Sequence, residues 1–208
     1  MARSGRRPGE PGTRERIEAA ARTAFAEFGY EGATIRVVAA RAEVDPALVH
    51  HYFGTKQRLF LSVMSLPVDM DRVFESILAG PREGIGRRFV GTLLRLWRDP
   101  TVLAVMIGLV RSATTEPGAA DLLRDMLGRQ GIFAFVAAVA PDDAEQRAML
   151  VGTQVIGLAM ARHVIGIEPL RSADPEWLAA AIGPTIERYL TGSLGEADRH
   201  APESAPLP

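Results

Sequence analysis

The sequence predicts an all-α protein in which a small three-helix N-terminal domain precedes a larger helical bundle. Apolar residues between positions 13 and 191 recur at the three- and four-residue spacing of amphipathic helices, and no segment shows a convincing strand alternation. Pairs such as Gly80-Pro81 and Asp99-Pro100 divide this stretch into segments of helical length. We therefore expect the N-terminal domain at 13–58 and the bundle at 59–191.

The two ends of the chain differ in composition from the helical region. Residues 1–12 hold three Arg, two Pro and three Gly, which predicts a flexible basic arm. Residues 192–208 are expected to form a disordered tail. The N-terminus lacks the apolar stretch of a signal peptide, and the absence of cysteine fits a reducing compartment, so we expect a cytoplasmic protein.

Composition and charge exclude several kinds of chemistry. Without cysteine there are no disulfides, thiolate metal sites or cysteine nucleophiles. With four histidines and no visible pairing of a nucleophile with a base, we expect neither an enzyme nor a cofactor. The net charge is −1, but residues 1–60 carry ten Lys and Arg against seven Asp and Glu, so the basic residues gather in the N-terminal part.

Capping signals predict four helix starts in the N-terminal part. The first helix should run from Thr13 to Phe28 and end at Gly29, which can adopt the left-handed backbone of a helix C-terminus. Thr34 can cap a second helix that reaches Ala42.

A third and a fourth helix follow at once. Asp45-Pro46 is a cap followed by a first-turn proline, which predicts a helix ending near Phe53. Gly54-Thr55 breaks the chain and caps a fourth helix that begins at Lys56. Lys56 is the only lysine of the chain, against 23 arginines.

The bundle should contain six helices, separated by proline-containing breaks. Pro67 is expected to kink the first of them or to start a new helix. The six predicted ranges are 56–79, 84–98, 101–115, 118–139, 142–166 and 174–191.

The second and third helices have the pattern of a helix-turn-helix. The side chains expected to brace the two helices are apolar: Val38, Ala39, Val44, Val49 and Phe53, backed by Ile17, Phe25 and Phe28. The third helix is left with small, aromatic and histidine side chains on its outer face, which suit a DNA major groove.

On these residues the chain resembles the TetR family of bacterial transcriptional repressors. In that family the block typically ends in Leu-Tyr, two mostly aromatic or histidine positions, a variable pair and a lysine. This chain reads Val49-His50-His51-Tyr52-Phe53-Gly54-Thr55-Lys56, followed by Leu59-Phe60. The motif resemblance covers Ile17 to Phe60, and the rest matches by helical architecture alone.

The resemblance implies a division of roles in the N-terminal domain. The residues expected to contact DNA phosphates are Thr34, His50, Tyr52 and Lys56. The residues expected to read base edges are Arg36, Pro46, Ala47, Leu48 and His51, with Arg36 able to reach a phosphate instead.

Two positions depart from the family pattern. His50 stands where Tyr is usual, and an imidazole can still donate to a phosphate. Glu43 stands where Gly is common in the turn, and a left-handed backbone there would cost a glutamate about 1 kcal/mol.

For three features we prefer a structural interpretation to a functional one. His50 and His51 are neighbours on a helix and do not face each other, so we expect no metal site. The acidic group at 142–145 is most simply the first turn of a helix. The apolar segment from Ala148 to Ile167 contains Arg162 and His163, so we expect a buried helix rather than a membrane span.

The resemblance also implies a homodimer, a double-stranded operator DNA and a small-molecule effector. The last two long helices would form the subunit interface, including Met149, Gly152, Ile156, Met160, Ala181 and Ile186. The residues that could line an effector pocket are Phe89, Arg95, Trp97, Met106, Phe133 and Gln154, although such residues at helical spacing are core by default.

The predicted function is therefore a dimeric, ligand-responsive repressor that binds a palindromic operator. The alternative is a helical protein-interaction module without sequence-specific DNA binding.

Overall fold

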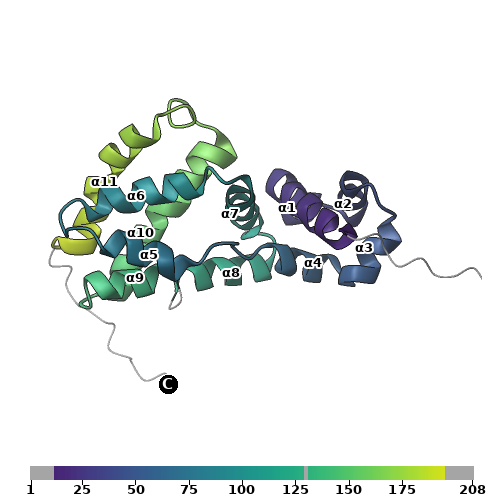
Figure 1. The fold of residues 1–208 in the computed structure, drawn as a ribbon, viewed down its shortest axis with the longest axis horizontal. Helices are drawn as coiled ribbons and strands as arrows, with labels where there is room; N and C mark the ends of the chain where they lie inside the picture. Colours follow the sequence, from purple (N-terminus) through teal and green to yellow (C-terminus); the bar gives the residue numbers. More distant parts are fainter. Residues whose placement is uncertain (1–11, 129–130, 195–208) are drawn as a thin grey trace, which may run out of the picture.

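The computed structural model describes residues 12–128 and 131–194, so most of the predicted arm and tail lies outside the described residues. All regular structure in these ranges is helical, which confirms the predicted fold class. In Figure 1 helices α1 to α4 form a unit at one end of the molecule, and α7 lies between this unit and the bundle. The N-terminal helices are α1 Thr13–Gly32, α2 Ile35–Ala42, α3 Pro46–Phe53 and α4 Lys56–Val63. The bundle helices are α5 Met70–Leu78, α6 Ile85–Leu96, α7 Pro100–Ser112, α8 Pro117–Leu127, α9 Ile132–Val139, α10 Ala144–Ala159 with the π-helical segment η1 Met160–Ile165, and α11 Pro175–Thr191.

Side-chain caps start the three short N-terminal helices where the sequence predicts. Thr34 accepts a hydrogen bond from the backbone N–H of Val37 at 3.2 Å. Asp45 and Thr55 accept from N–H groups in the first turns of α3 and α4 at 2.7 and 3.1 Å. Each cap satisfies one backbone donor that a helix start leaves without an intrahelical partner.

Gly29 breaks the helical path of α1 with a φ of 67°, as its place in the sequence predicts. One further turn follows it, so α1 is assigned as far as Gly32.

Two predicted long helices are each divided in two. The helix predicted at 56–79 ends at Val63, and α5 starts only at Met70, capped by Asp69. Pro67 lies in the irregular stretch between them, where a proline cannot continue a helix. The helix predicted at 118–139 is α8 and α9. The backbone leaves the helical conformation at Gly128, with ψ −156°, and is again non-helical at Gly131, with ψ −129°, directly before α9.

Two apolar cores share α7. The N-terminal core combines residues of α1 to α4 with Val105 and Leu109 of α7. The bundle core includes Val102 and Met106, which lie on another face of the same helix. Close approach is possible at Gly108, because a Cβ there would lie only 3.0 Å from the sulfur of Met64. The N-terminal unit is therefore packed against the bundle over an extended surface.

Helices α6 and α11 cross at two glycines. A Cβ on Gly86 would lie 2.1 Å from the carbonyl oxygen of Gly183, a distance that no side chain tolerates. Gly183 in turn lies against the backbone of Arg87, which a Cβ would approach to 2.8 Å. The absence of side chains at this crossing sets the separation of the two helices.

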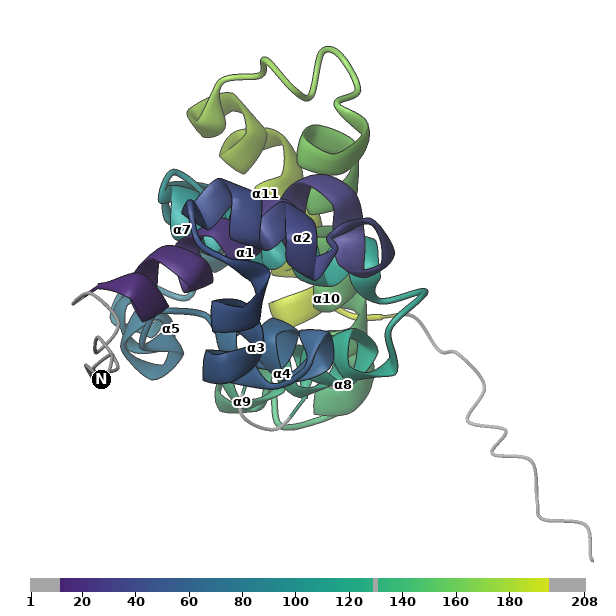
Figure 2. The same cartoon turned by 90° about the vertical axis from the view of Figure 1, so that its right-hand side faces the viewer.

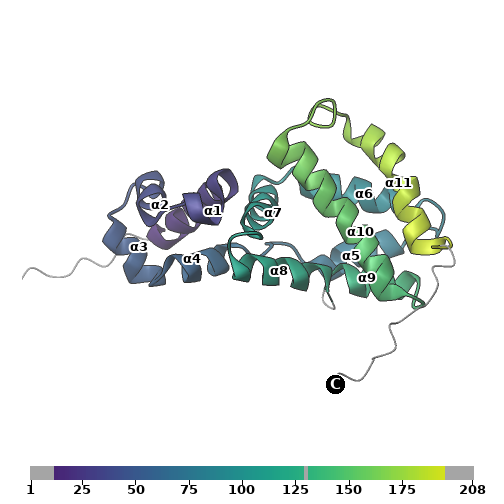
Figure 3. The ribbon, with the colours of Figure 1, turned by 180° about the vertical axis from the view of Figure 1, so that it is seen from behind.

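Glu116 forms a second connection between the N-terminal unit and the bundle. Its side chain is 6% exposed and caps α8 by accepting from the N–H of Gly118 at 3.1 Å. The same carboxylate accepts from Nε2 of Gln57 on α4, also at 3.1 Å. Burial, followed by the charge and hydrogen bond of Glu116, raises the pKa of Tyr30. Figures 1 and 3 show α4 and α8 following one another along one edge of the molecule.

Ala144–Ile165 is the one helix, among the residues described, that is long and apolar enough to cross a membrane by length and composition. The core helix of a folded bundle has the same composition. Here Ala148, Val151 and Val155 belong to the bundle core, but only 33% of the apolar window is buried, so the prediction of a buried helix holds for one face alone.

We expect Gly86→Ala to lower the free energy of unfolding by about 1–3 kcal/mol, because the added methyl group forces α6 and α11 apart. The matched control is Gly91→Ala on the same helix. Its Cβ would meet its nearest neighbours at 3.8 and 3.9 Å. That change should be neutral or stabilising by up to about 1 kcal/mol, since alanine favours a helix more than glycine does. Urea unfolding of both variants tests this; equal stability would contradict a tight crossing.

We expect Glu116→Ala to lower the free energy of unfolding by about 1–3 kcal/mol, because it leaves the Gln57 amide and the Gly118 N–H without their acceptor. Glu116→Gln keeps an acceptor oxygen and should lose less. If the two variants unfold at the same urea concentration, the hydrogen bonds of the Glu116 side chain do not stabilise the contact between α4 and α8.

Candidate DNA interface and ligand cavity

Helix α3 presents one face to the N-terminal core and the other to solvent. Val49 and Phe53 are buried, at 0% and 7% exposure. Pro46, Ala47 and His51 are exposed, and so is Arg36 in the first turn of α2. Figure 2 views the molecule from this end, with α2 and α3 toward the viewer. A short helix exposed in this way can enter a major groove.

The predicted base-reading set is therefore largely accessible. Four of its members are exposed, and the fifth, Leu48, is half-buried. The His51 ring lies edge-on to the Tyr52 ring, with centroids 5.4 Å apart. This contact orients the imidazole on the outer face of α3.

His50 has a hydrogen-bonding pattern that the sequence does not reveal. Its Nδ1 lies 3.0 Å from the carbonyl oxygen of Gly54. A carbonyl can only accept, so Nδ1 carries the proton. Nε2 can then donate to a phosphate only when the ring is protonated. The expectation that this imidazole donates to phosphate holds for the imidazolium form.

Lys56 is fixed by two contacts at the start of α4. Its ammonium group donates to the carbonyl oxygen of Glu31 at 3.2 Å and lies 4.4 Å from the centre of the Tyr30 ring. The remaining ammonium hydrogens can reach an anion. Thr34 and Tyr52, the other predicted phosphate contacts, are exposed and half-buried, respectively.

Glu43 adopts the left-handed backbone that the family pattern suggests for its position, with φ 54° and ψ 47°. The turn keeps its hydrogen bonds: the N–H of Glu43 donates to Ala40 and that of Val44 to Ala39. The left-handed backbone costs a glutamate about 1 kcal/mol relative to glycine, and the turn is closed by hydrogen bonds despite this cost.

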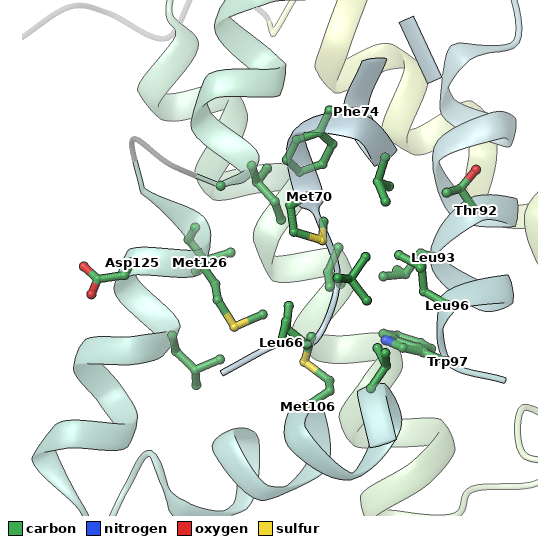
Figure 4. Close-up of a pocket in the computed structure, with 18 of the residues that line it drawn as sticks. Leu66, Met70, Phe74, Thr92, Leu93, Leu96, Trp97, Met106, Asp125 and Met126 are labelled. Carbon is green, nitrogen blue, oxygen red and sulfur yellow. The ribbon is translucent and has the colours of Figure 1, made fainter. Parts of the chain in front are cut away.

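A cavity of about 320 Å³ opens inside the bundle. Its wall is contributed by α5 to α10 and the segment between α4 and α5 (Figure 4). Nearly all of the lining is apolar. The members that Figure 4 labels are Leu66, Met70, Phe74, Thr92, Leu93, Leu96, Trp97, Met106, Asp125 and Met126.

Three of the predicted pocket residues line the cavity: Phe89, Trp97 and Met106. The other three do not, because helical phase turns them away. Arg95 is exposed and donates to Thr92 at 2.6 Å. Phe133 and Gln154 each lie next to a lining residue, Ile132 and Val155, but on another face.

Sequence reasoning missed the part of the wall between α4 and α5. The signal for it is the run of apolar residues around Pro67, which includes Met64, Leu66, Val68 and Met70. Met64, Leu66 and Val68 lie in the irregular segment between α4 and α5, and Met70 is the first residue of α5.

The predicted interface residues are divided between the surface and the interior. Met149 and Ala181 are exposed, and Met160 is half-buried. Ile186 is 1% exposed in the bundle core, so it does not fit an interface, whereas Ile156 is half-buried and also lines the cavity. Gly152 is also wrong as an interface residue, because a Cβ there would lie 2.6 Å from Leu127 of α8.

On the exposed faces of α10 and α11, Met149 and Ala181 are joined by four residues that were not predicted, all at four-residue spacing. On α10 the set consists of Met149, Thr153 and Gly157, and on α11 of Trp177, Ala181 and Thr185. Trp177 is 56% exposed.

No group of three His, Asp or Glu side chains suited to hold a metal ion occurs within the described ranges.

Comparison with known proteins agrees with this architecture. The family model "Bacterial regulatory proteins, tetR family" matches residues 17–63, and "Tetracyclin repressor-like, C-terminal domain" matches residues 83–190. The HTH-type transcriptional regulator BetI of Brucella anthropi is 47% identical over 190 residues, which cover 87% of this chain and 92% of that protein. The match to the transcriptional repressor AcnR of Corynebacterium efficiens is local, with 41% identity over 51 residues that cover 24% of this chain and 27% of that protein.

Solved structures show the same fold. A TetR-family regulator from Streptomyces coelicolor A3 has a TM-score of 0.57 and 37% identity, covering 90% of this chain and 99% of that one. A transcriptional regulator from Rhodococcus sp. Rha1 has a TM-score of 0.60 and 29% identity, covering 86% of this chain and 96% of that one. Since one family model alone spans more than half of the sequence, the chain belongs to the TetR family of DNA-binding transcriptional regulators.

Proposed function

We propose that this regulator is a cytoplasmic repressor that binds a palindromic operator as a homodimer and is released by a small molecule entering the bundle cavity. The observation that carries the proposal is the double role of α7. Val102 and Met106 line the cavity, whereas Val105 and Leu109 belong to the N-terminal core. A molecule that displaces α7 therefore changes the support of the DNA-binding helices.

Two further contacts support the same coupling. Met64 both lines the cavity and belongs to the N-terminal core. Helix α8 lines the cavity with Leu122 and Met126, and its capping residue Glu116 binds Gln57 on α4. Lys56 precedes Gln57 in the chain, so the predicted phosphate contact lies next to the contact between α4 and α8.

The energetic requirement is specific. The effector must bind more tightly to the conformation that is unable to bind DNA than to the conformation that binds it. The difference in binding free energy is about 1–3 kcal/mol for a typical coupling.

For the homodimer we propose an interface formed by the exposed faces of α10 and α11, with Met149 and Trp177 as their largest apolar side chains. Two-fold symmetry would then place two α3 helices on one face of the DNA.

Selection of bound DNA from a random pool tests this function directly. We expect a two-fold symmetric sequence, and a protein–DNA complex containing two chains. The affinity should fall steeply with salt, by about 0.9 in log K per log salt for each phosphate contact. A flat salt response with no enriched sequence would favour a protein-interaction module.

We expect Lys56→Gln to weaken binding to operator and to random DNA alike, because a phosphate contact carries no sequence information. The slope of log K against log salt should decrease by about 0.9 for each lost contact. Fluorescence anisotropy at several salt concentrations measures both effects. Arg72→Ala is the charge-matched control, since Arg72 lies on α5 and pairs with Asp69. An equal loss of slope in both variants would show a general charge effect.

We expect His51→Ala to change sequence preference, because its side chain is placed to contact base edges. Discrimination at the contacted base pair should fall by about 1–3 kcal/mol. The control is His50→Ala on the same helix, which should weaken binding without changing the preferred sequence. Competition assays with single-base operator variants measure this; unchanged discrimination would remove His51 from the base-reading set.

A further inference from the structure

Within residues 12–128 and 131–194, the cavity wall carries almost no charge. Asp125 is the only ionisable residue of this described lining, and its side chain is exposed. Figure 4 shows the carboxylate of Asp125 directed away from the other lining side chains. A charged group entering the cavity would lose its hydration without gaining a counter-charge, which is strongly unfavourable.

The hydroxyl groups of the wall lie at its margin. Ser65 is exposed, and the Thr92 hydroxyl already accepts a hydrogen bond from Arg95 at 2.6 Å. The Thr92 hydroxyl keeps a proton to donate, but Thr92 is half-buried and Ser65 is exposed, so neither residue is as buried as Trp97.

Trp97 is different, because it is 4% exposed and lines the cavity. In Figure 4 its indole nitrogen is turned toward Leu66 and Met106, on the side where the lining residues converge. The backbone N–H of Trp97 donates to the carbonyl oxygen of Leu93, but its indole N–H has no hydrogen-bond acceptor within the described part of the chain. An indole N–H can only donate, so the cavity offers one free donor to whatever occupies it.

The position of this donor is fixed from behind by His163. The two rings meet edge-to-face at 90°, with centroids 5.4 Å apart. Burial, and to a lesser degree the charge of Arg162, lower the pKa of His163, so the imidazole behind Trp97 is neutral at neutral pH. The neighbouring cations are directed elsewhere: Arg162 donates to the carbonyls of Leu170 and Ala173, and Arg111 to that of Val164.

We propose that the cavity takes an uncharged, largely apolar molecule with a hydrogen-bond acceptor that receives the Trp97 indole N–H. This inference rests on the proposed function, in which the cavity is the effector site. The apolar wall supplies most of the affinity through burial, and the indole fixes the orientation of the ligand. The volume of about 320 Å³ lies at the small end of the usual range for ligand sites, which fits a molecule with one ring or a short chain.

Four probes with a common phenylbutyl-type skeleton test the proposal: benzylacetone, butylbenzene, phenylbutyrate and phenylbutylamine. The first has a carbonyl acceptor, the second has none, and the last two are an anion and a cation at neutral pH. Calorimetric titration of the full chain should show benzylacetone binding at least about tenfold more tightly than either charged probe.

The Trp97→Phe variant isolates the hydrogen bond, because phenylalanine keeps an apolar ring and removes the donor. The ratio of the affinities for benzylacetone and butylbenzene should fall by about three- to tenfold in this variant, as expected for one hydrogen bond. Using a ratio cancels any general effect of the substitution on the shape of the cavity.

Three results would overturn the proposal. They are tighter binding of a charged probe, an unchanged ratio in Trp97→Phe, and no binding of any probe to a preparation that is folded and binds DNA. Operator binding is measured in the same preparation. Release of DNA by benzylacetone therefore tests the repressor mechanism separately: binding without release supports the ligand class and contradicts the mechanism.

Discussion

The packing of α7 against both cores is the constraint on which the rest of the structure depends. Val105 and Leu109 complete the core beneath the DNA-binding helices, and the adjacent face of the same helix forms a wall of the cavity. Gly108 allows this packing, because a side chain there would press on Met64. A rigid helix with apolar contacts on two sides cannot move toward one core without leaving the other, since protein interiors are densely packed.

The hydrogen bonds of Glu116 connect the bundle to the N-terminal unit at a second place, between α8 and α4. A buried carboxylate that caps one helix and receives a hydrogen bond from another resists separation of α8 and α4, because its partners would lose their acceptor. Under the proposed function, a movement of α8 at the cavity would be transmitted along the edge of the molecule to α4. The apolar packing of α7 and the polar link of Glu116 act on different helices of the N-terminal unit, so both the position and the tilt of the unit depend on the bundle.

Local signals made the N-terminal unit predictable. Thr34, Asp45 and Thr55 cap helices because of their own chemistry, and the alternation of buried and exposed residues on α3 follows from helical periodicity. The buried faces of the bundle helices are harder to predict from sequence, because apolar residues occupy most faces of these helices. Gly152 and Ile186 were expected on the outside and lie inside, since the choice of face depends on the packing of α8 and α6. The cavity wall between α4 and α5 is irregular, and its apolar residues stand at every second position, which is not the spacing of a helix.

The glycine crossing of α6 and α11 has a consequence for how the two subunits of a dimer would respond. Helix α6 contributes Phe89, Leu93 and Leu96 to the cavity and touches α11 with almost no intervening side chain at Gly86. In a dimer joined through α11, a shift of α6 in one subunit would reach the partner across a single, incompressible contact. Occupation of the first cavity would then alter the affinity of the second, and the response to effector would be cooperative rather than graded.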